Sequence, residues 1–399
     1  MRILLADDDR ITRIRLNAYL QEWGHEVVLA EDGNQAWELF RRESPWLVIS
    51  DWQMPGMSGI EFVRRLREAT PPGQYVYAIL LTSRSEKTDL VEGMEAGADD
   101  FVAKPFDKDE LRVRIRAGER LVGLERALAE RNQELSGINE RMRGDLRTAA
   151  RIQNAFLPRE DEEFPGIRAA WRYQPCDELA GDTLNVLRLD ESHVGFYVAD
   201  VAGHGVASSL LSVMLSRLLS KGTSGEGFLV RHDAAAGGPE IVSPAEVARH
   251  LNRQFPWNPE AMEYFTLFYG VFEAWSGVLR YVCAGHPRPV LVPAGRPAEQ
   301  LRSDPPALGM FPDAEFTEHR VRLAPGDRLY AFTDGLVEAL SPAAEQFGEA
   351  RILKVAEAHR SRTLPVSVRA IVAGAGVWRE GRDPTDDQCV LGIEIAGGQ

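Results

Sequence analysis

Four aspartates in the C-terminal half of the chain each stand where an apolar run meets a turn. They are Asp182, Asp200, Asp334 and Asp386, in the settings DELAGDTLN, FYVADVAGHG, FTDGLVEA and DPTDDQCVLG. Taken alone, each is better explained as a turn residue whose side chain bonds its own backbone. Taken together, they suit a hard divalent cation, because Mg²⁺ and Mn²⁺ prefer oxygen ligands and because clustered carboxylates repel one another unless cations neutralise them. The set therefore predicts a metal-dependent hydrolase.

The residues around these aspartates extend the pattern into a family resemblance. The stretches AGD, DVAGHG, FTLFYGVFEAWSGVLRYVCAGHPRPVL, TDGLVEA and DDQCVLGIEI follow the motif order of PPM-type protein phosphatases and resemble their bacterial SpoIIE/RsbU-like branch over roughly residues 150 to 399. The resemblance implies an α-β-β-α sandwich: two antiparallel sheets flanked by helices, with a metal centre at one end. It implies that two Mn²⁺ or Mg²⁺ ions are held by Asp182, Asp200, Asp334, Asp386 and the backbone carbonyl of Val201. Such ions activate water for attack on phosphorus, so no protein nucleophile is required.

Three positions depart from the pattern of that family. Ala180 stands where glycine is usual, Asn185 where a second aspartate often follows, and Cys389 where threonine is usual. None of them removes a core ligand, so an active phosphatase is the leading interpretation and a catalytically weak or inactive adaptor is the alternative. Cys176, Cys283 and Cys389 form no CxxC pair, which favours small apolar fillers over ligands or nucleophiles.

The N-terminal half carries a second set of polar residues at strand ends. Residues 1 to about 118 alternate apolar runs with amphipathic stretches, which predicts a doubly wound parallel sheet of five strands. Sheets of this kind place their sites at the C-terminal ends of the strands. Those ends are occupied by Asp7, Asp8, Asp51, Thr82 and Lys104.

These positions, within ADDD, SDWQMPGMSG, LLTS and DDFVAKPF, resemble a CheY-like response-regulator receiver. The resemblance implies that Asp51 accepts a phosphoryl group from a sensor histidine kinase or a phosphotransfer protein. It implies that Lys104 pairs with the phosphoryl oxygens, that Thr82 bonds one of them, and that Phe101 turns inward when Thr82 moves. It implies an Mg²⁺ site made by Asp7, Asp8, Asp51 and the carbonyl of Gln53. The alternative is a receiver that keeps the fold and has lost phosphoacceptance.

Between the two halves, residues 119–157 contain a repeat of seven. Its apolar positions are Leu121, Leu128, Leu135, Met142, Ala149 and Phe156, with Leu124, Ile138 and Ile152 between them and Arg131 and Asp145 interrupting the second set. This spacing predicts a coiled coil that pairs two chains as a parallel homodimer; the alternative is one amphipathic helix packed on its own domains. The final turns, ARIQNAFLP, resemble the segment that leads into the phosphatase core and acts there as a switch.

Composition limits the partners. The chain has 60 acidic and 46 basic residues and a net charge of −14, which disfavours non-specific nucleic-acid binding. No apolar run approaches the ~20 residues of a membrane span, so we expect no membrane association and a cytoplasmic location in a bacterium. We expect the Gly-rich stretch 221–242 to be a mobile loop, and His204 to hold the turn beside Asp200.

The sequence therefore predicts three parts: a receiver over 1–118, a coiled-coil signalling helix over 119–157 and a PPM-type phosphatase over 158–399. Together they form a response regulator whose phosphorylation controls a serine/threonine phosphatase. The family resemblance implies a phosphorylated anti-sigma-factor antagonist as the substrate.

Overall fold

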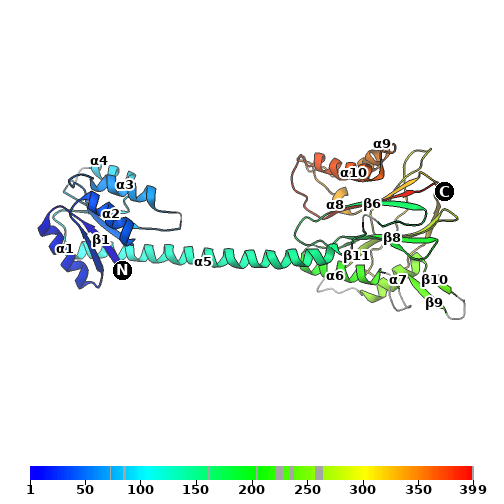
Figure 1. Cartoon of the computed structure of the whole chain (residues 1–399), viewed down its shortest axis with the longest axis horizontal. Helices are drawn as coiled ribbons and strands as arrows, with labels where there is room; N and C mark the ends of the chain where they lie inside the picture. The colour runs from blue at the N-terminus through cyan, green and yellow to red at the C-terminus, as the bar shows by residue number, and fades with distance from the viewer. Residues whose placement is uncertain are drawn as a thin grey trace. The chain divides into compact units, whose positions relative to one another are not determined.

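The computed structural model describes residues 1–71, 73–83, 87–159, 162–203, 205–220, 228–233, 238–256 and 264–397. The chain divides into two compact units, Met1–Arg141 and Met142–Gln399 (Figure 1). His204 lies outside the described residues.

The first unit is a parallel five-stranded sheet in the order β2-β1-β3-β4-β5. Its strands are β1 (Arg2–Ala6), β2 (Glu26–Ala30), β3 (Leu47–Asp51), β4 (Tyr77–Thr82) and β5 (Asp100–Ala103). Its helices are α1 (Arg10–Glu22), α2 (Gly33–Glu43), α3 (Gly59–Ala69), α4 (Lys87–Glu95) and the beginning of α5 (Lys108–Asn154). The predicted doubly wound fold is confirmed.

Apolar side chains cover both faces of this sheet, as the near-continuous apolar strands require. Leu16 of α1 and Leu111 of α5 pack on one face, and Phe62 of α3 packs on the other. Local capping fixes where the helices begin: Asp9 accepts the main-chain N–H groups of residues 11 and 12 at the start of α1. The helix α1 therefore begins directly after the short segment that carries Asp7 and Asp8.

The helix α5 runs without interruption for 47 residues. Its first turns belong to the receiver core through Leu111, Ile115 and Val122. Farther along, the apolar positions of the seven-residue repeat are exposed, with exposed fractions from 37% to 69% for Leu121, Leu124, Leu128, Leu135, Ile138, Met142 and Ile152. Ala149 and Phe156, at the end of the repeat, are half-buried, but the exposed positions have no partner within the described chain, so pairing with a second copy stays a prediction.

The second unit is a sandwich of two antiparallel five-stranded sheets. One sheet has the order β15-β12-β11-β8-β7 and the other β14-β13-β16-β17-β6. The strands are β6 (Ile167–Gln174), β7 (Thr183–Arg188), β8 (His193–Val201), β11 (Phe265–Glu273), β12 (Val278–Ala284), β13 (Val290–Val292), β14 (Glu299–Gln300), β15 (His319–Arg322), β16 (Arg328–Phe332) and β17 (Gln388–Ile395). The helices are α6 (Val206–Leu218), α7 (Pro244–Gln254), α8 (Asp334–Val337), α9 (Glu349–Ala358) and α10 (Leu364–Trp378).

Three apolar layers hold the sandwich together. One lies between the sheets and includes Phe196, Phe268 and Leu391. A second lies under α6 and α7, and a third lies under α9 and α10, on the opposite side in Figure 1. The predicted helix-flanked sandwich is confirmed.

The stretch 221–242, which we expected to be a mobile loop, contains secondary structure in its described part. It contains an antiparallel pair, β9 (Val230–Asp233) and β10 (Gly238–Ile241). Leu229 and Val242, at the base of the pair, are buried against the layer under α6 and α7. The apolar residues that anchor these strands are few and are separated by glycines, so no period is visible in the sequence.

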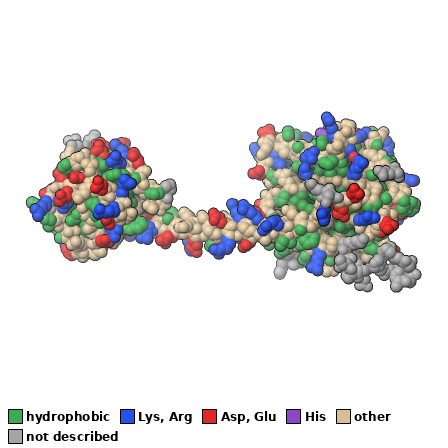
Figure 2. All heavy atoms as spheres, in the orientation of Figure 1, with side chains coloured by type: hydrophobic (Ala, Val, Ile, Leu, Met, Phe, Trp, Pro, Cys, Tyr) green, Lys and Arg blue, Asp and Glu red, His purple; other side chains and the backbone are tan. Residues whose placement is uncertain are grey.

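Charges of both signs are interspersed over the visible face of each unit, rather than gathered by sign (Figure 2). No helix of the described chain is long and apolar enough to cross a membrane.

Candidate metal centres

The first candidate centre is at the C-terminal edge of the parallel sheet. Asp7 and Asp8 follow β1 and Asp51 ends β3, which is the neighbour of β1. One carboxylate oxygen from each of the three lies within 4.8 Å of the others. The fold thus brings together the three aspartates that the sequence analysis assigned to Mg²⁺.

Lys104 joins this group from the end of β5. Its Nζ lies 2.9 Å from Asp7 Oδ2 and 2.9 Å from Asp51 Oδ1. Burial raises the pKa of Asp51, and the hydrogen bond from Lys104 opposes that shift. Burial alone would lower the pKa of Lys104, but its bonds to Asp7 and Asp51 raise it overall, so the amine stays a cation beside the carboxylates.

The remaining receiver candidates lie along the same sheet edge or on the strand beside it. Thr82 ends β4, is 1% exposed, and its carbonyl accepts the Lys104 N–H at 2.6 Å. Phe101 is half-buried on β5, with the guanidinium of Arg114 5.7 Å from its ring centroid. Gln53 follows Asp51 by two residues and is exposed.

Arg13 is a further residue of this site, and the sequence did not point to it. This side chain is buried in α1 and donates from Nη1 to the carbonyls of Asp7 (2.7 Å) and Asp8 (3.1 Å). It also bonds Glu31 at 2.7 Å. Arg13 fixes the main chain that carries the acidic pair, and only its place on the buried side of α1 could have indicated this.

The second candidate centre is a cleft of about 650 Å³ in the sandwich. Three of the predicted aspartates, Asp200, Asp334 and Asp386, line it together with Val201. Asp200 and Val201 end β8, Asp334 opens α8, and Asp386 precedes β17. The cleft is thus built where strands of both sheets end.

Asp182 is buried and is not among the residues that line this cleft. It precedes β7, and its Oδ2 accepts a 2.7 Å hydrogen bond from Thr333 Oγ1. Thr333 in turn accepts the N–H of Cys389 at 3.0 Å. Asp182 nevertheless interacts electrostatically with Asp200.

The electrostatics of this group favour a cation. Burial and the neighbouring Asp200 raise the pKa of Asp182, while burial and the charges of Asp334 and Asp386 raise the pKa of Asp200 to about 8. Burial and Asp386 raise the pKa of Asp334 to about 6. Ionised carboxylates are therefore destabilised unless positive charge is supplied. Since the donors facing the cleft are oxygens, the set fits a hard divalent cation.

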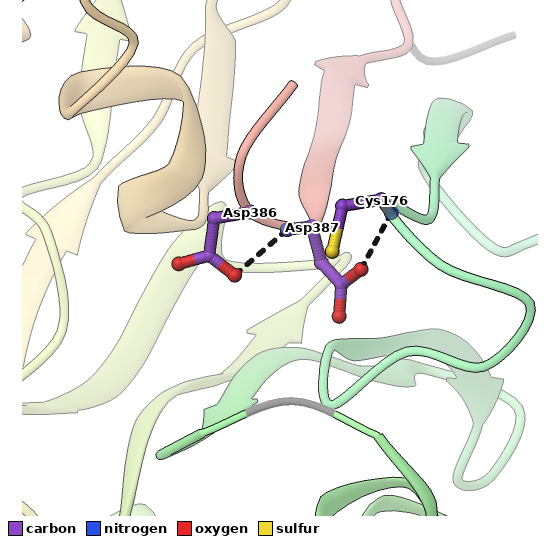
Figure 3. Close-up of side chains that lie close together, drawn as sticks. All are labelled: Cys176, Asp386 and Asp387. Atoms are coloured by element: carbon purple, nitrogen blue, oxygen red, sulfur yellow. Dashed lines mark hydrogen bonds between the residues drawn. The ribbon is translucent and has the colours of Figure 1, made fainter. Parts of the chain in front are cut away.

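Asp387 and Cys176 lie beside Asp386 and form a contact group with it (Figure 3). The carboxylate of Asp387 accepts the N–H of Cys176 at 2.8 Å and the N–H of Gly181 at 2.7 Å. Burial and Asp387 raise the pKa of Cys176 to about 12, so the thiol is a poor ligand. Asp387 holds the loop that leads to Asp182, a function that the sequence analysis did not assign.

Gly181 allows the same loop to approach β8. A Cβ at this position would lie 2.9 Å from the carbonyl oxygen of Val201. That carbonyl is the main-chain oxygen that the family resemblance assigns to the metal site, and Asp182 is the next residue along the chain. The close approach brings both toward the same region.

The three departures from the family pattern are accommodated. Ala180 has no positive φ, so the backbone there needs no glycine. Asn185 donates to the carbonyl of Phe156 at 2.7 Å and thereby holds the segment after α5 against β7. Cys389 is fully buried beside Asp182.

Gln153, near the end of α5, contacts the same loop and was also missed. Its Nε2 donates to the carbonyl of Ala180 at 2.6 Å, and its Oε1 accepts the N–H of Ala180 at 3.2 Å. Nε2 also donates to Ser212 of α6 at 2.8 Å. Ala180 precedes Asp182 by two residues, so direct hydrogen bonds connect α5 to the loop that carries part of the acidic group.

Comparison with known proteins finds two families. The family described as stage II sporulation protein E (SpoIIE) matches residues 190–396, and the response regulator receiver domain matches residues 3–116.

Among curated proteins, the response regulator MprA of Mycobacterium leprae (strain TN) is 42% identical over 117 residues, covering 29% of this chain and 50% of that protein. A probable transcriptional regulator ycf27 of Porphyridium aerugineum is 38% identical over 137 residues, covering 34% of this chain and 55% of that protein. The chain thus spans about half the length of the curated relatives it matches.

Among solved structures, the SiaA-PP2C domain of Pseudomonas aeruginosa has a TM-score of 0.54 and 21% identity, covering 65% of this chain and 98% of that chain. At this identity the likeness establishes the fold alone.

Proposed function

Because this chain belongs to the SpoIIE family and carries a response regulator receiver domain ahead of its phosphatase domain, we propose that it is a metal-dependent protein serine/threonine phosphatase controlled by phosphorylation of Asp51. Its functional parts are the receiver (1–118), the signalling helix (119–157) and the phosphatase (158–399). It acts in the cytoplasm, where a sensor histidine kinase or a phosphotransfer protein supplies the phosphoryl group. The family resemblance suggests a phosphorylated anti-sigma-factor antagonist as the substrate.

The observation that carries the proposal is the convergence of Asp200, Asp334 and Asp386 on one cleft, two of them with raised pKa values. With Asp182 and the Val201 carbonyl they would hold two Mn²⁺ or Mg²⁺ ions. Such ions supply an activated water and neutralise charge on phosphoryl oxygens. Other residues of the chain position these ligands. Thr333 orients Asp182, and Asp387 holds the loop of residues 176–181 against the start of β17.

In the receiver, Asp51 is the nucleophile that takes the phosphoryl group. Asp7, Asp8, Asp51 and the Gln53 carbonyl would hold Mg²⁺. Lys104 already contacts Asp51 and would balance the charge that phosphorylation adds. Thr82 and Phe101 would then shift as the two switch residues.

Control reaches the phosphatase through α5. The helix shares its first turns with the receiver core and its last turns with the Ala180 loop. A change at the receiver can alter phosphatase activity only by favouring one of two arrangements of this helix. The hydrogen bonds from Gln153 to Ala180 and Ser212 are the contacts that would differ between the two arrangements.

The experiment measures hydrolysis of a phosphoserine peptide with Mn²⁺ or Mg²⁺, and then with EDTA. Asp200→Asn and Asp334→Asn should each cost about 3–4 kcal/mol of barrier, or two to three orders of magnitude in rate. Glu191→Gln, an exposed carboxylate outside the cleft, is the matched control. Full activity in EDTA or in both variants would refute the metal mechanism. A folded wild-type protein without activity would favour the adaptor alternative.

A further inference from the structure

The side chain of Gln388 connects the two segments that carry Asp334 and Asp386. Gln388 is the first residue of β17, follows Asp386 by two residues and is 1% exposed. Its Nε2 donates a 2.9 Å hydrogen bond to the carbonyl of Gly335, the residue after Asp334. The proposed function assigns no part to this side chain, although it lies between two of the aspartates on which that function depends.

The partner fixes the direction of this hydrogen bond. A main-chain carbonyl can only accept, so the end of the Gln388 amide that faces Gly335 is the NH₂ group. The other end, Oε1, is buried and has no hydrogen-bond partner among the described residues. A buried acceptor without a partner costs at least as much free energy as one hydrogen bond contributes. The stability of the sandwich alone therefore does not explain a glutamine at this position.

The hydrogen bond lies where the backbone pairing of β16 and β17 ends. At the end of that pairing, the N–H of Thr333 donates to the carbonyl of Cys389 at 3.2 Å. From Asp334 the chain turns into α8, which has four residues. A helix this short cannot satisfy its own carbonyls, so they need donors from elsewhere. Gln388 is the donor for Gly335, and its side chain extends the contact between the two segments into α8.

Gly335 allows α8 to approach the segment before β17 closely. A Cβ at this position would lie 2.1 Å from the carbonyl oxygen of Asp387 and 3.2 Å from the Cβ of Asp386. Only glycine fits at such distances. The hydrogen bond from Gln388 holds the same glycine from the other partner's side chain, so the main chains beside Asp334 and Asp386 adjoin at a fixed point.

The separation of these two aspartates matters for a metal ion. Both line the cleft, and both belong to the predicted ligand set. Mg²⁺ in particular requires oxygen ligands in near-ideal octahedral geometry. A residue that holds ligand-carrying segments in place affects the metal without touching it, and loss of such a residue typically lowers metal affinity 10- to 100-fold, as an order of magnitude.

We propose that Gln388 is a positioning residue of the phosphatase metal centre, and that its hydrogen bond to Gly335 sets the separation of Asp334 and Asp386 and so raises the affinity for Mn²⁺ or Mg²⁺. This inference rests on the proposed phosphatase function and deepens it.

The test measures Mn²⁺ binding without substrate, by counting free Mn²⁺ with electron paramagnetic resonance during a titration of the full chain. Gln388→Met fills a similar space and removes the donor, and it should raise the dissociation constant for Mn²⁺ about tenfold. Gln300→Met is the matched control, because Gln300 of β14 also donates from Nε2, at 2.8 Å to Glu349, and does not line the cleft. It should leave the dissociation constant unchanged. The receiver site is the same in all three chains, so a difference between them reports the phosphatase centre.

Thermal unfolding in EDTA verifies that each chain is folded at the temperature of the titration. If Gln388→Met does not fold, Gln388→Leu, which also lacks the donor, takes its place. A dissociation constant equal to that of the wild type, or raised no more than in Gln300→Met, overturns the inference. A wild type that binds no more Mn²⁺ than Asp200→Asn overturns it as well. If the wild type binds Mn²⁺ but hydrolyses no phosphoserine peptide, the phosphatase function fails while the titration still decides on Gln388.

Discussion

Replacing Gln153 with alanine should loosen the connection between α5 and the Asp182 loop. The side chain is 7% exposed and makes three hydrogen bonds, two with Ala180 and one with Ser212. Its loss leaves the N–H of the fully buried Ala180 without that partner. Ser212 Oγ lies 3.3 Å from the Ala180 carbonyl and can compensate in part for the lost hydrogen bond there.

The magnitude follows from these contacts. Three buried hydrogen bonds at about 1 kcal/mol each, reduced by the compensation from Ser212, give a loss of about 2–3 kcal/mol in the free energy of unfolding. For a unit the size of the sandwich this corresponds to a fall in Tm of about 4–12 °C. Since Ala180 precedes Asp182 by two residues, the midpoint for Mn²⁺ should also move to higher concentration.

The assay is thermal unfolding of the full chain, followed by fluorescence in EDTA and across a Mn²⁺ titration. Gln133→Ala, an exposed glutamine on the same helix, is the matched control and should leave both Tm and the Mn²⁺ midpoint unchanged. A Tm within about 1 °C of the wild type, with an unchanged Mn²⁺ midpoint, would refute the reasoning that α5 supports the metal loop.

Two further predictions concern the seam and the acidic group. The double change Leu128→Glu and Leu135→Glu places charges in the exposed seam of α5 and should convert a parallel dimer to a monomer, as measured by light scattering. The change Glu130→Gln, which lies outside the seam, should leave the dimer intact. A monomeric wild type would contradict the coiled coil. The pKa values of Asp200 (about 8) and Asp334 (about 6) are raised in the folded chain, so above pH ~4 and without metal the folded chain keeps protons that the unfolded chain has released. In EDTA, the free energy of unfolding should therefore fall as pH rises from about 4 to 8. Mn²⁺ should weaken this dependence because it favours the ionised carboxylates, and a Tm that rises steadily over that range in EDTA would contradict the assignment.

The features of this chain that could best be predicted from the sequence are the strands of the receiver and the residues at their ends. Parallel strands end at one edge of a sheet, so Asp7, Asp51 and Lys104 could be placed together from the order of the apolar runs alone. The parallel sheet of the receiver was predicted from its apolar runs, whereas the antiparallel sandwich was expected only from the family resemblance that the ordered motifs carry.

The supporting contacts could not be predicted, because they join segments far apart in the chain. Gln153 meets Ala180 across 27 residues, and Asp387 meets Cys176 across 211. No local sequence pattern indicates that either side chain makes these long-range hydrogen bonds. The β9–β10 pair was missed for a different reason, since its few apolar residues are interrupted by glycines.

The measurement that tests the central claim most directly is phosphatase activity in the full chain with and without a small-molecule phosphodonor, in the wild type and in Asp51→Ala. Phosphorylation at Asp51 should change the wild-type rate, in the direction of activation, by about tenfold, which requires a difference of about 1.4 kcal/mol between the two arrangements of α5. Asp51→Ala should not respond to the donor. Equal rates in all four combinations would show that the receiver does not control the phosphatase.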